Sequence, residues 1–418
     1  MEQDYFYDIH CHLMDMSHPN LIAFLRRLNL RAYLAAGGLP VIGSIATAFV
    51  GTRLSSVVNL LSVMDRGIAG MIQALNDDIQ LAFRGPVRVG VREYRGVILT
   101  PLMIDFGVKD VADMGALPDI HYRRIPHKAI AGQVIDLFNG IRESYAGHPR
   151  EIVGIYPFLG INPANYHLET GGGHTGIRDL LNKYFSSCSR DEGEARAGRI
   201  EHAARGFSGS IEDLGDHAFA GVKVYPPLGF DPWPRSDEER EKVVYLYRFC
   251  EEKNIPITTH CGGRGYRAIP ASDAELFTSP MRWEQVLDSF PRLKVNFAHF
   301  GGGIGGLMIG KWTRQIAELI LHSRNRNVYT DLAYLCFGPK DYRGLLRTME
   351  KLSGGNIERL CDRILFGTDF MIHLMDCDSY ASYLQGFIQA DFLDQGVRDL
   401  RHRFCCENPR RFLFYKPA

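Results

Sequence analysis

The 418-residue chain lacks an excess of charge of either sign and lacks paired cysteines. Lys and Arg number 48, as do Asp and Glu, so the formal net charge is zero, and no long-range field favours nucleic acid as a partner. The nine cysteines are odd in number and scattered, without a CxxC pair, which argues against both a disulfide framework and a zinc ribbon. A reducing, cytoplasmic location is therefore expected.

From its first residues the sequence is not expected to carry a secretory leader. The opening "MEQDYFYDIH" is acidic and becomes strand-like at once, which leaves no room for a charged region followed by an apolar one. This agrees with the cytoplasmic expectation.

Charged residues are absent from one long apolar stretch, 32–52, "AYLAAGGLPVIGSIATAFVGT". Its length approaches that of a membrane span, but four glycines and a proline dilute it, and spanning is excluded if both flanks build one domain. For the surrounding segment 32–64 we favour a buried or interface helical hairpin, with peripheral membrane contact as the alternative. Such a segment can join copies into a homo-oligomer or cover an apolar substrate.

Short apolar, β-branched runs recur along the chain, each followed by a longer helical pattern. Continuous apolar strands that alternate with helices indicate a parallel sheet covered on both faces, and eight of them predict a (β/α)8 TIM barrel. We expect one domain over 1–418, with insertions at about 13–94, apolar and helical, and 165–215. The runs are 5–11, 95–105, 151–160, 219–226, 255–261, 293–300, 327–334 and 363–370.

Polar side chains that can bind a metal stand at the C-terminal ends of several runs, where an apolar run should simply stop. The C-terminal ends of barrel strands meet at one mouth, where catalysis occurs, so residues distant in sequence become neighbours. A lone histidine at a strand end is more often a hydrogen-bonded structural residue than a ligand; the ordered set predicts a metal site. These residues are His10 and His12, Lys223, His260, His299 and Asp369.

The first pair, in "YFYDIHCH", has the spacing that shared ligation requires. Side chains two apart on a strand point to one face, while Cys11 points to the other. His10 and His12 can therefore share one ion. Imidazoles with a carboxylate suit zinc, and also iron, manganese or nickel, with a position left open for water.

The ordered motifs "DIHCH", "GVKVYPP", "ITTHCGG", "VNFAHFGG" and "ILFGTDF", with the ending "CCENPRRFLFY", resemble the amidohydrolase superfamily. The likeness is to its amidohydrolase-related branch, which includes aminocarboxymuconate-semialdehyde decarboxylase-like enzymes. It spans residues 5–415 and is weakest over the two insertions. The resemblance implies that His10, His12, His260 and Asp369 bind a divalent metal, with His299 as an acid/base or electrostatic group and Asp369 as the base for metal-bound water.

Three further residues are candidates for substrate binding. Lys223 is a metal ligand only if it is carboxylated in a binuclear site; one ion is favoured over two, and Lys223 then pairs with an anionic substrate or a neighbouring carboxylate. Tyr225 shares its face and offers a hydroxyl. Arg264 can bind a carboxylate, or can be a solvated loop arginine.

Asp331, at the end of another run, either orients a ligand histidine or caps a helix.

The expected function is metal-dependent hydrolysis of an amide, ester or lactone in a small carbonyl- or carboxyl-containing molecule. A divalent ion lowers the pKa of its water and polarises a carbonyl, and a nearby imidazole moves protons. The alternative is non-oxidative decarboxylation of an aromatic or unsaturated carboxylic acid by the same ligands. A third hypothesis, a non-enzymatic scaffold that binds a partner through 32–64, predicts a degenerate site.

Overall fold

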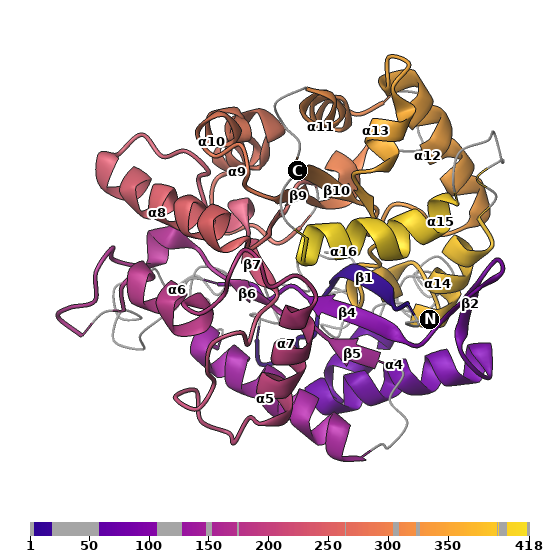
Figure 1. The fold of residues 1–418 in the computed structure, drawn as a ribbon, viewed down its shortest axis with the longest axis horizontal. Coiled ribbons are helices and arrows are strands. Elements are labelled where there is room, and N and C mark those ends of the chain that lie inside the picture. The colour runs from indigo at the N-terminus through magenta and orange to yellow at the C-terminus, as the bar shows by residue number, and fades with distance from the viewer. Residues whose placement is uncertain are drawn as a thin grey trace, which may run out of the picture.

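A computed structural model gives the fold (Figure 1) and describes ten stretches of the chain. The apolar stretch 32–52, most of the segment 32–64, and Arg264 lie outside the described residues. None of the helices within the described stretches is long and apolar enough to cross a membrane. The described residues are 4–18, 58–106, 128–147, 153–173, 175–263, 265–303, 309–322, 327–390, 392 and 399–415.

Parallel strands form at every predicted run. The strands are shorter than the runs, because the residues at the ends of most runs are not paired with a neighbouring strand. They are β1 Phe6–Cys11, β4 Val97–Pro101, β5 Val153–Ile155, β6 Phe158–Gly160, β7 Gly221–Val224, β8 Ile257–Thr259, β9 Val295–Phe297, β10 Val328–Asp331 and β11 Ile364–Leu365.

The strands close on themselves into an eight-position ring within the described chain. One sheet runs β1-β4-β5 and the other β11-β10-β9-β8-β7-β6, and all these pairs are parallel. Two isolated bridges join the sheets, Leu102 to Phe158 and Cys11 to Phe370. Since β5 and β6 are successive pieces of one run, they share one position. The predicted TIM barrel is confirmed.

Helices surround the ring of strands (Figure 1). The insertions predicted at 13–94 and 165–215 hold α4 with the antiparallel pair β2 Val87–Val89 and β3 Arg92–Tyr94, and then α6 and α7. The helices are α4 Gly67–Phe83, α5 Ile130–Gly147, α6 Ile177–Phe185, α7 Ala195–Arg205, α8 Asp237–Lys253, α9 Ala271–Thr278, α10 Glu284–Ser289, α11 Lys311–Leu321, α12 Pro339–Leu352, α13 Ile357–Cys361, α14 Tyr380–Ile388, α15 Leu400–His402 and α16 Asn408–Leu413.

Local sequence explains how these helices begin and pack, as α12 illustrates. Pro339 occupies the first turn, where no backbone N–H is needed. The Asp341 carboxylate accepts hydrogen bonds from the backbone N–H groups of Phe337 and Gly338, each at 2.9 Å. Tyr342, Leu345, Leu346 and Met349 are buried, and this spacing puts them on the one face that meets the barrel.

An inner cluster of buried side chains fills the N-terminal half of the barrel and includes residues of α16. Phe412 of α16 stacks on Phe158 with ring centroids 6.3 Å apart and lies 5.2 Å from the ring of Tyr329. Both partners stand at the start of their strands, so α16 closes this end. The cluster is Tyr7, Ile9, Ile98, Leu102, Tyr156, Phe158, Ile200, Ala220, Tyr329, Leu365, Phe412, Leu413 and Phe414.

Candidate metal centre

The two histidines of the first motif meet the aspartate of the last one at the barrel mouth. The Nε2 atoms of His10 and His12 lie 3.5 Å and 3.3 Å from Oδ1 of Asp369. The ladder of β1 is irregular between Asp8 and Cys11, and Cys11 packs in the main core. The three residues form a group whose ligand atoms all lie within 4.8 Å of one another.

The other nitrogen of each imidazole is held by an acceptor. Nδ1 of His12 lies 2.8 Å from the carbonyl oxygen of Leu102, and Nδ1 of His299 lies 2.9 Å from that of Ala333. A carbonyl only accepts, so each Nδ1 carries a proton, and Nε2 is the nitrogen left to face the mouth. His10 is held in the same way, with Nδ1 3.0 Å from Oδ2 of Asp331.

Asp331 orients this histidine, as one of the two sequence alternatives proposed. Its carboxylate also accepts from the backbone N–H of His299 at 2.9 Å, that of Ala333 at 3.1 Å and the Asn296 amide at 2.8 Å. Burial raises the pKa of Asp331, but the contact with His10 and these donors outweigh burial and lower it. Burial lowers the pKa of His10 to about 4, against the pull of Asp331. The pair is therefore a neutral imidazole on a carboxylate.

Asp369 is held in an uncommon backbone conformation after the last strand. Its φ is +61°, a region that non-glycine residues adopt at some cost and that clusters at functional sites. Its backbone N–H donates to the carbonyl of His10 at 2.7 Å. Burial raises the pKa of its carboxyl, but the neighbouring imidazoles of His12, His10 and His299 outweigh burial and lower it.

His299 and His260 complete the mouth in different ways. The His299 ring lies 4.7 Å from that of His10 and 5.1 Å from that of His260, and His299 belongs to a second close group with His10 and Asp331. His260 is in neither of these two groups, nor in the other close groups found among the described residues. The structure therefore brings His10, His12 and Asp369 together and places His260 against His299.

Tyr225 and Gly265 support His260. The Tyr225 ring stacks on the His260 ring at 4.6 Å, and its hydroxyl accepts from the backbone N–H of Tyr266 at 3.2 Å. Gly265 has φ +128°, and a Cβ there would lie 2.5 Å from the Tyr225 hydroxyl and 3.1 Å from Nε2 of His260. Only glycine fits this approach, so Gly265 makes a close backbone contact with the site.

Lys223 lies inside the barrel as a buried cation. Its side chain is 1% exposed, and Nζ has no hydrogen-bond partner among the described residues. Burial lowers its pKa to about 8, against the raising effect of the Asp331 and Asp369 charges. A buried charge without a hydrogen-bond partner is costly, so this ammonium is suited to receive an anion.

One residue that supports the site, Asp8, was missed by sequence reasoning. Asp8 is fully buried, and its carboxylate accepts from the backbone N–H groups of His10 and Thr368 and from the hydroxyls of Thr368 and Tyr380. Asp8 thereby links β1 to the segment that carries Asp369. A carboxylate inside an apolar strand is unusual, and this feature of the sequence could have identified Asp8 as a supporting residue. His373 is also buried, its ring lies 4.9 Å from that of Tyr383, and burial lowers its pKa to about 4. It packs as a neutral aromatic ring.

The donor set fits a divalent transition-metal ion. Two imidazole Nε2 atoms face one carboxylate, and each imidazole is held through Nδ1. Nitrogen and carboxylate ligands with outer hydrogen bonds of this kind hold zinc and its neighbours in proteins.

Comparison with known proteins identifies the family. A family model described as Amidohydrolase matches residues 197–415, just over half of the chain, and the match contains Lys223, His260, His299 and Asp369. No curated protein matches the chain.

Several solved structures are similar over nearly the whole chain. One is a probable 2-pyrone-4,6-dicarboxylic acid hydrolase from Acinetobacter baumannii, at 11% identity and TM-score 0.44, with 98% of each chain covered. Another is a 4-oxalomesaconate hydratase from Rhodopseudomonas palustris, at 13% identity and TM-score 0.43, with 98% of this chain and 95% of that chain covered. A third is a uronate isomerase from Bacillus halodurans, at 13% identity and TM-score 0.40, with 98% and 93% covered. TM-scores of this size support no statement about activity.

Proposed function

Because the chain belongs to the amidohydrolase family of enzymes, we propose that it is a metal-dependent hydrolase. Its substrate would be an amide, ester or lactone of a small carbonyl- or carboxyl-containing molecule. The observation that carries the proposal is the convergence of His10 Nε2 and His12 Nε2 on the Asp369 carboxylate, 3.5 Å and 3.3 Å away.

His10, His12 and Asp369 would hold one divalent cation, with His260 nearby as the further ligand that the sequence predicts. Zinc suits these donors best, and manganese, iron or nickel are compatible. When bound, the cation polarises a carbonyl oxygen and lowers the pKa of water.

Two residues of the chain are placed to move protons. The lowered pKa of Asp369 keeps its carboxylate ionised at neutral pH, so an oxygen of this group can accept a proton from the attacking water. His299 is held through Nδ1 by the Ala333 carbonyl, which leaves Nε2 as the atom that exchanges a proton with the leaving group.

Lys223 and Tyr225 would bind the substrate. The buried Lys223 ammonium fits a substrate carboxylate, which would supply the partner it lacks among the described residues. Carboxylation of Lys223 to bridge a second ion is the alternative, and it predicts two ions per chain. The same lysine also suits decarboxylation of an aromatic or unsaturated acid, so the assay must detect both reactions.

The test is a metal-dependence assay on a panel of lactones, esters, amides and aromatic acids. Acid release or ring opening should disappear on chelation, return with the metal, and fall at least about 100-fold in Asp369→Asn. The matched control is Asp288→Asn, an exposed carboxylate of α10, which should retain activity. Hydrolysis that survives thorough chelation, or that is unchanged in Asp369→Asn, contradicts the proposal, and carbon dioxide release without hydrolysis favours the decarboxylase.

A further inference from the structure

Asn296 is a fully buried asparagine in the middle of β9, where an apolar or β-branched residue is expected. Its neighbours Val295 and Phe297 pack in the main core, and the Phe297 ring lies 5.9 Å from that of Trp283. Because successive side chains of a strand point to opposite faces, Asn296 points the other way, into the barrel. There it stands level with Thr258 of β8 in the parallel register.

The amide of Asn296 contacts the carboxylate that holds His10. Its Nδ2 lies 2.8 Å from Oδ2 of Asp331, the same oxygen that lies 3.0 Å from Nδ1 of His10. The pKa of the Asp331 carboxyl lies below its ordinary value, so the group is ionised and only accepts hydrogen bonds. The amide is therefore oriented with its NH2 group towards Asp331.

Four donors hold the Asp331 carboxylate within the described chain. Oδ1 accepts from the backbone N–H groups of His299 and Ala333, at 2.9 Å and 3.1 Å. His10 and Asn296 contact Oδ2. A carboxylate has about four acceptor positions, so this set is complete. Since two of the donors are backbone groups and His10 is a candidate ligand, the side chain at 296 is the part of the set that sequence can vary.

Stability alone does not explain this asparagine, as a second buried asparagine shows. Oδ1 of Asn296 and Oδ1 of Asn254 both lack a hydrogen-bond partner among the described residues, and an unpaired buried acceptor is costly. Asn254 has a local reason to be asparagine, because it ends α8 at φ +56°, a conformation that asparagine adopts more readily than most residues. Asn296 lies in a strand, so its contact with Asp331 is the reason that remains.

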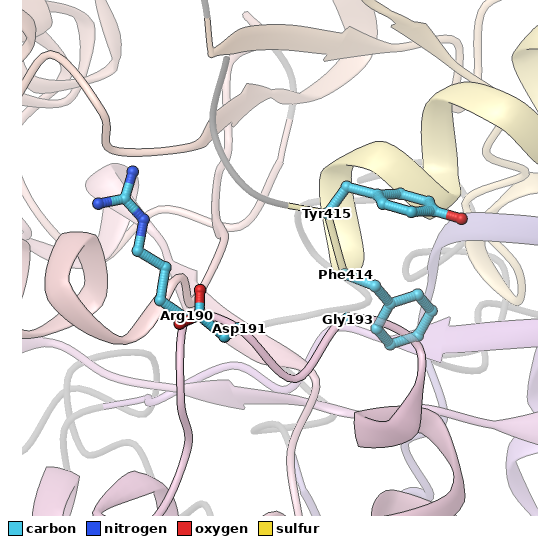
Figure 2. A pocket seen from close by; sticks show the side chains of 5 residues that line it. All are labelled: Arg190, Asp191, Gly193, Phe414 and Tyr415. Atoms are coloured by element: carbon cyan, nitrogen blue, oxygen red, sulfur yellow. The ribbon is translucent and has the colours of Figure 1, made fainter.

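Asn254 is also remote from the mouth. Its Nδ2 donates to the backbone carbonyls of Phe414 and Tyr415, at 3.3 Å and 3.2 Å. Both residues line a cavity of about 390 Å³ beside the last helix (Figure 2), and Phe414 belongs to the inner cluster at the N-terminal end of the barrel. Asn254 therefore offers a control, a buried asparagine amide far from the metal centre.

We propose that Asn296 is a positioning residue of the metal centre, which fixes the Asp331 carboxylate in the orientation that receives Nδ1 of His10. His10 then presents Nε2 to the cation with its ring already oriented. The inference rests on the proposed function for the cation, whereas the contacts from Asn296 through Asp331 to His10 belong to the chain itself. Partners of ligand histidines typically contribute about 10- to 100-fold in metal affinity, and Asn296 stands one contact further out.

The first test is a double-mutant cycle on zinc affinity, measured by competition with a chelator of known affinity. Asn296→Leu removes the amide at similar size and should weaken zinc binding about 3- to 10-fold. In Asp331→Asn protein the same change should have little further effect, because the carboxylate through which Asn296 acts is gone. Asn296→Ala, which adds no apolar bulk, should behave as Asn296→Leu does. Unchanged affinity in both variants, or equal losses in both backgrounds, would overturn the proposal.

The second test uses metal-free protein and separates this inference from the proposed function. With histidine nitrogens isotope-labelled for NMR, the Nδ1 proton of His10 should exchange with solvent faster in Asn296→Leu than in the wild type, because Asp331 is held less firmly. Asn254→Gly tolerates the positive φ and should lower the unfolding midpoint while leaving zinc affinity and this exchange unchanged. A wild type that binds no zinc refutes the metal centre, whereas unchanged exchange in Asn296→Leu refutes the positioning role.

Discussion

The two ends of the barrel are built on opposite rules. At the C-terminal end, His10, His12 and His299 are each held through Nδ1 and turn Nε2 towards the mouth. At the N-terminal end, α16 inserts Phe412 between aromatic rings, and Arg410 pairs with Asp4 and Glu194. At the C-terminal end, nitrogen atoms are thus left available for ligand binding, whereas at the N-terminal end the side chains are packed or paired with one another. Residues that serve the reaction and residues that stabilise the fold therefore lie at opposite ends of the barrel.

The largest effect is expected at the mouth, from Asp369→Asn. The amide keeps the shape but removes the carboxylate charge and the proton acceptor, so kcat/KM should fall about 100- to 10,000-fold. Steady-state kinetics on a substrate found in the panel measures it, and the thermal unfolding midpoint should barely move. If the variant instead lost activity because it unfolds, Asp369 would contribute to stability, and the proposed difference between the two ends of the barrel would be wrong.

At the opposite end, Phe412→Ala should act on stability alone. The side chain is fully buried, and removing it should cost about 3–5 kcal/mol in the free energy of unfolding. Denaturant titration measures this, with Phe412→Leu as the milder control. Loss of bound metal from folded Phe412→Ala protein would show that the two ends are not independent.

Asp331→Asn tests the contact that orients His10, a candidate metal ligand. The amide can still contact His10 but cannot match the charge of the carboxylate that holds Nδ1 at 3.0 Å, so metal affinity or activity should fall about 10- to 100-fold. Competition with a chelator of known affinity gives the value. An unchanged affinity would mean that the Asp331 contact does not tune His10.

The smallest effect concerns pH and the buried His402, whose Nδ1 lies 2.8 Å from the Tyr94 hydroxyl. Burial and then the Arg92 charge lower its pKa from 6.5, against the raising effects of Glu407, Asp4 and Asp399. The unfolded state therefore binds more protons, and stability from this site is lost as pH falls below 6.5. Replacement by Gln, which does not titrate, should flatten the fall of the unfolding midpoint from pH 7 to 5. An identical fall in both proteins would rule out this contribution.

The sequence predicted every barrel strand because apolar runs and turn residues are local signals. Two runs form less strand than predicted, because contacts and turns beyond the local sequence decide where their strands end. The run 151–160 divides into β5 and β6 around Pro157, which has no N–H for the ladder. The run 363–370 contains only Ile364–Leu365 as strand, because the chain then turns to place Asp369 at φ +61°.

The sequence predicted the side chains of the candidate site, but not the groups that hold these side chains in place. The spacing of His10 and His12 follows from strand periodicity alone. The acceptors behind His12 and His299 are the backbone carbonyls of Leu102 and Ala333, which every residue has and no pattern marks.

Elemental analysis of the purified protein asks whether His10, His12 and Asp369 hold a metal. We predict one divalent transition-metal ion per chain in the wild type, loss of that ion in His12→Ala, and its retention in Asp288→Asn, which changes an exposed carboxylate of α10. A wild-type protein that binds no ion when metal is supplied, or a metal content unchanged in His12→Ala, would contradict the proposed metal centre.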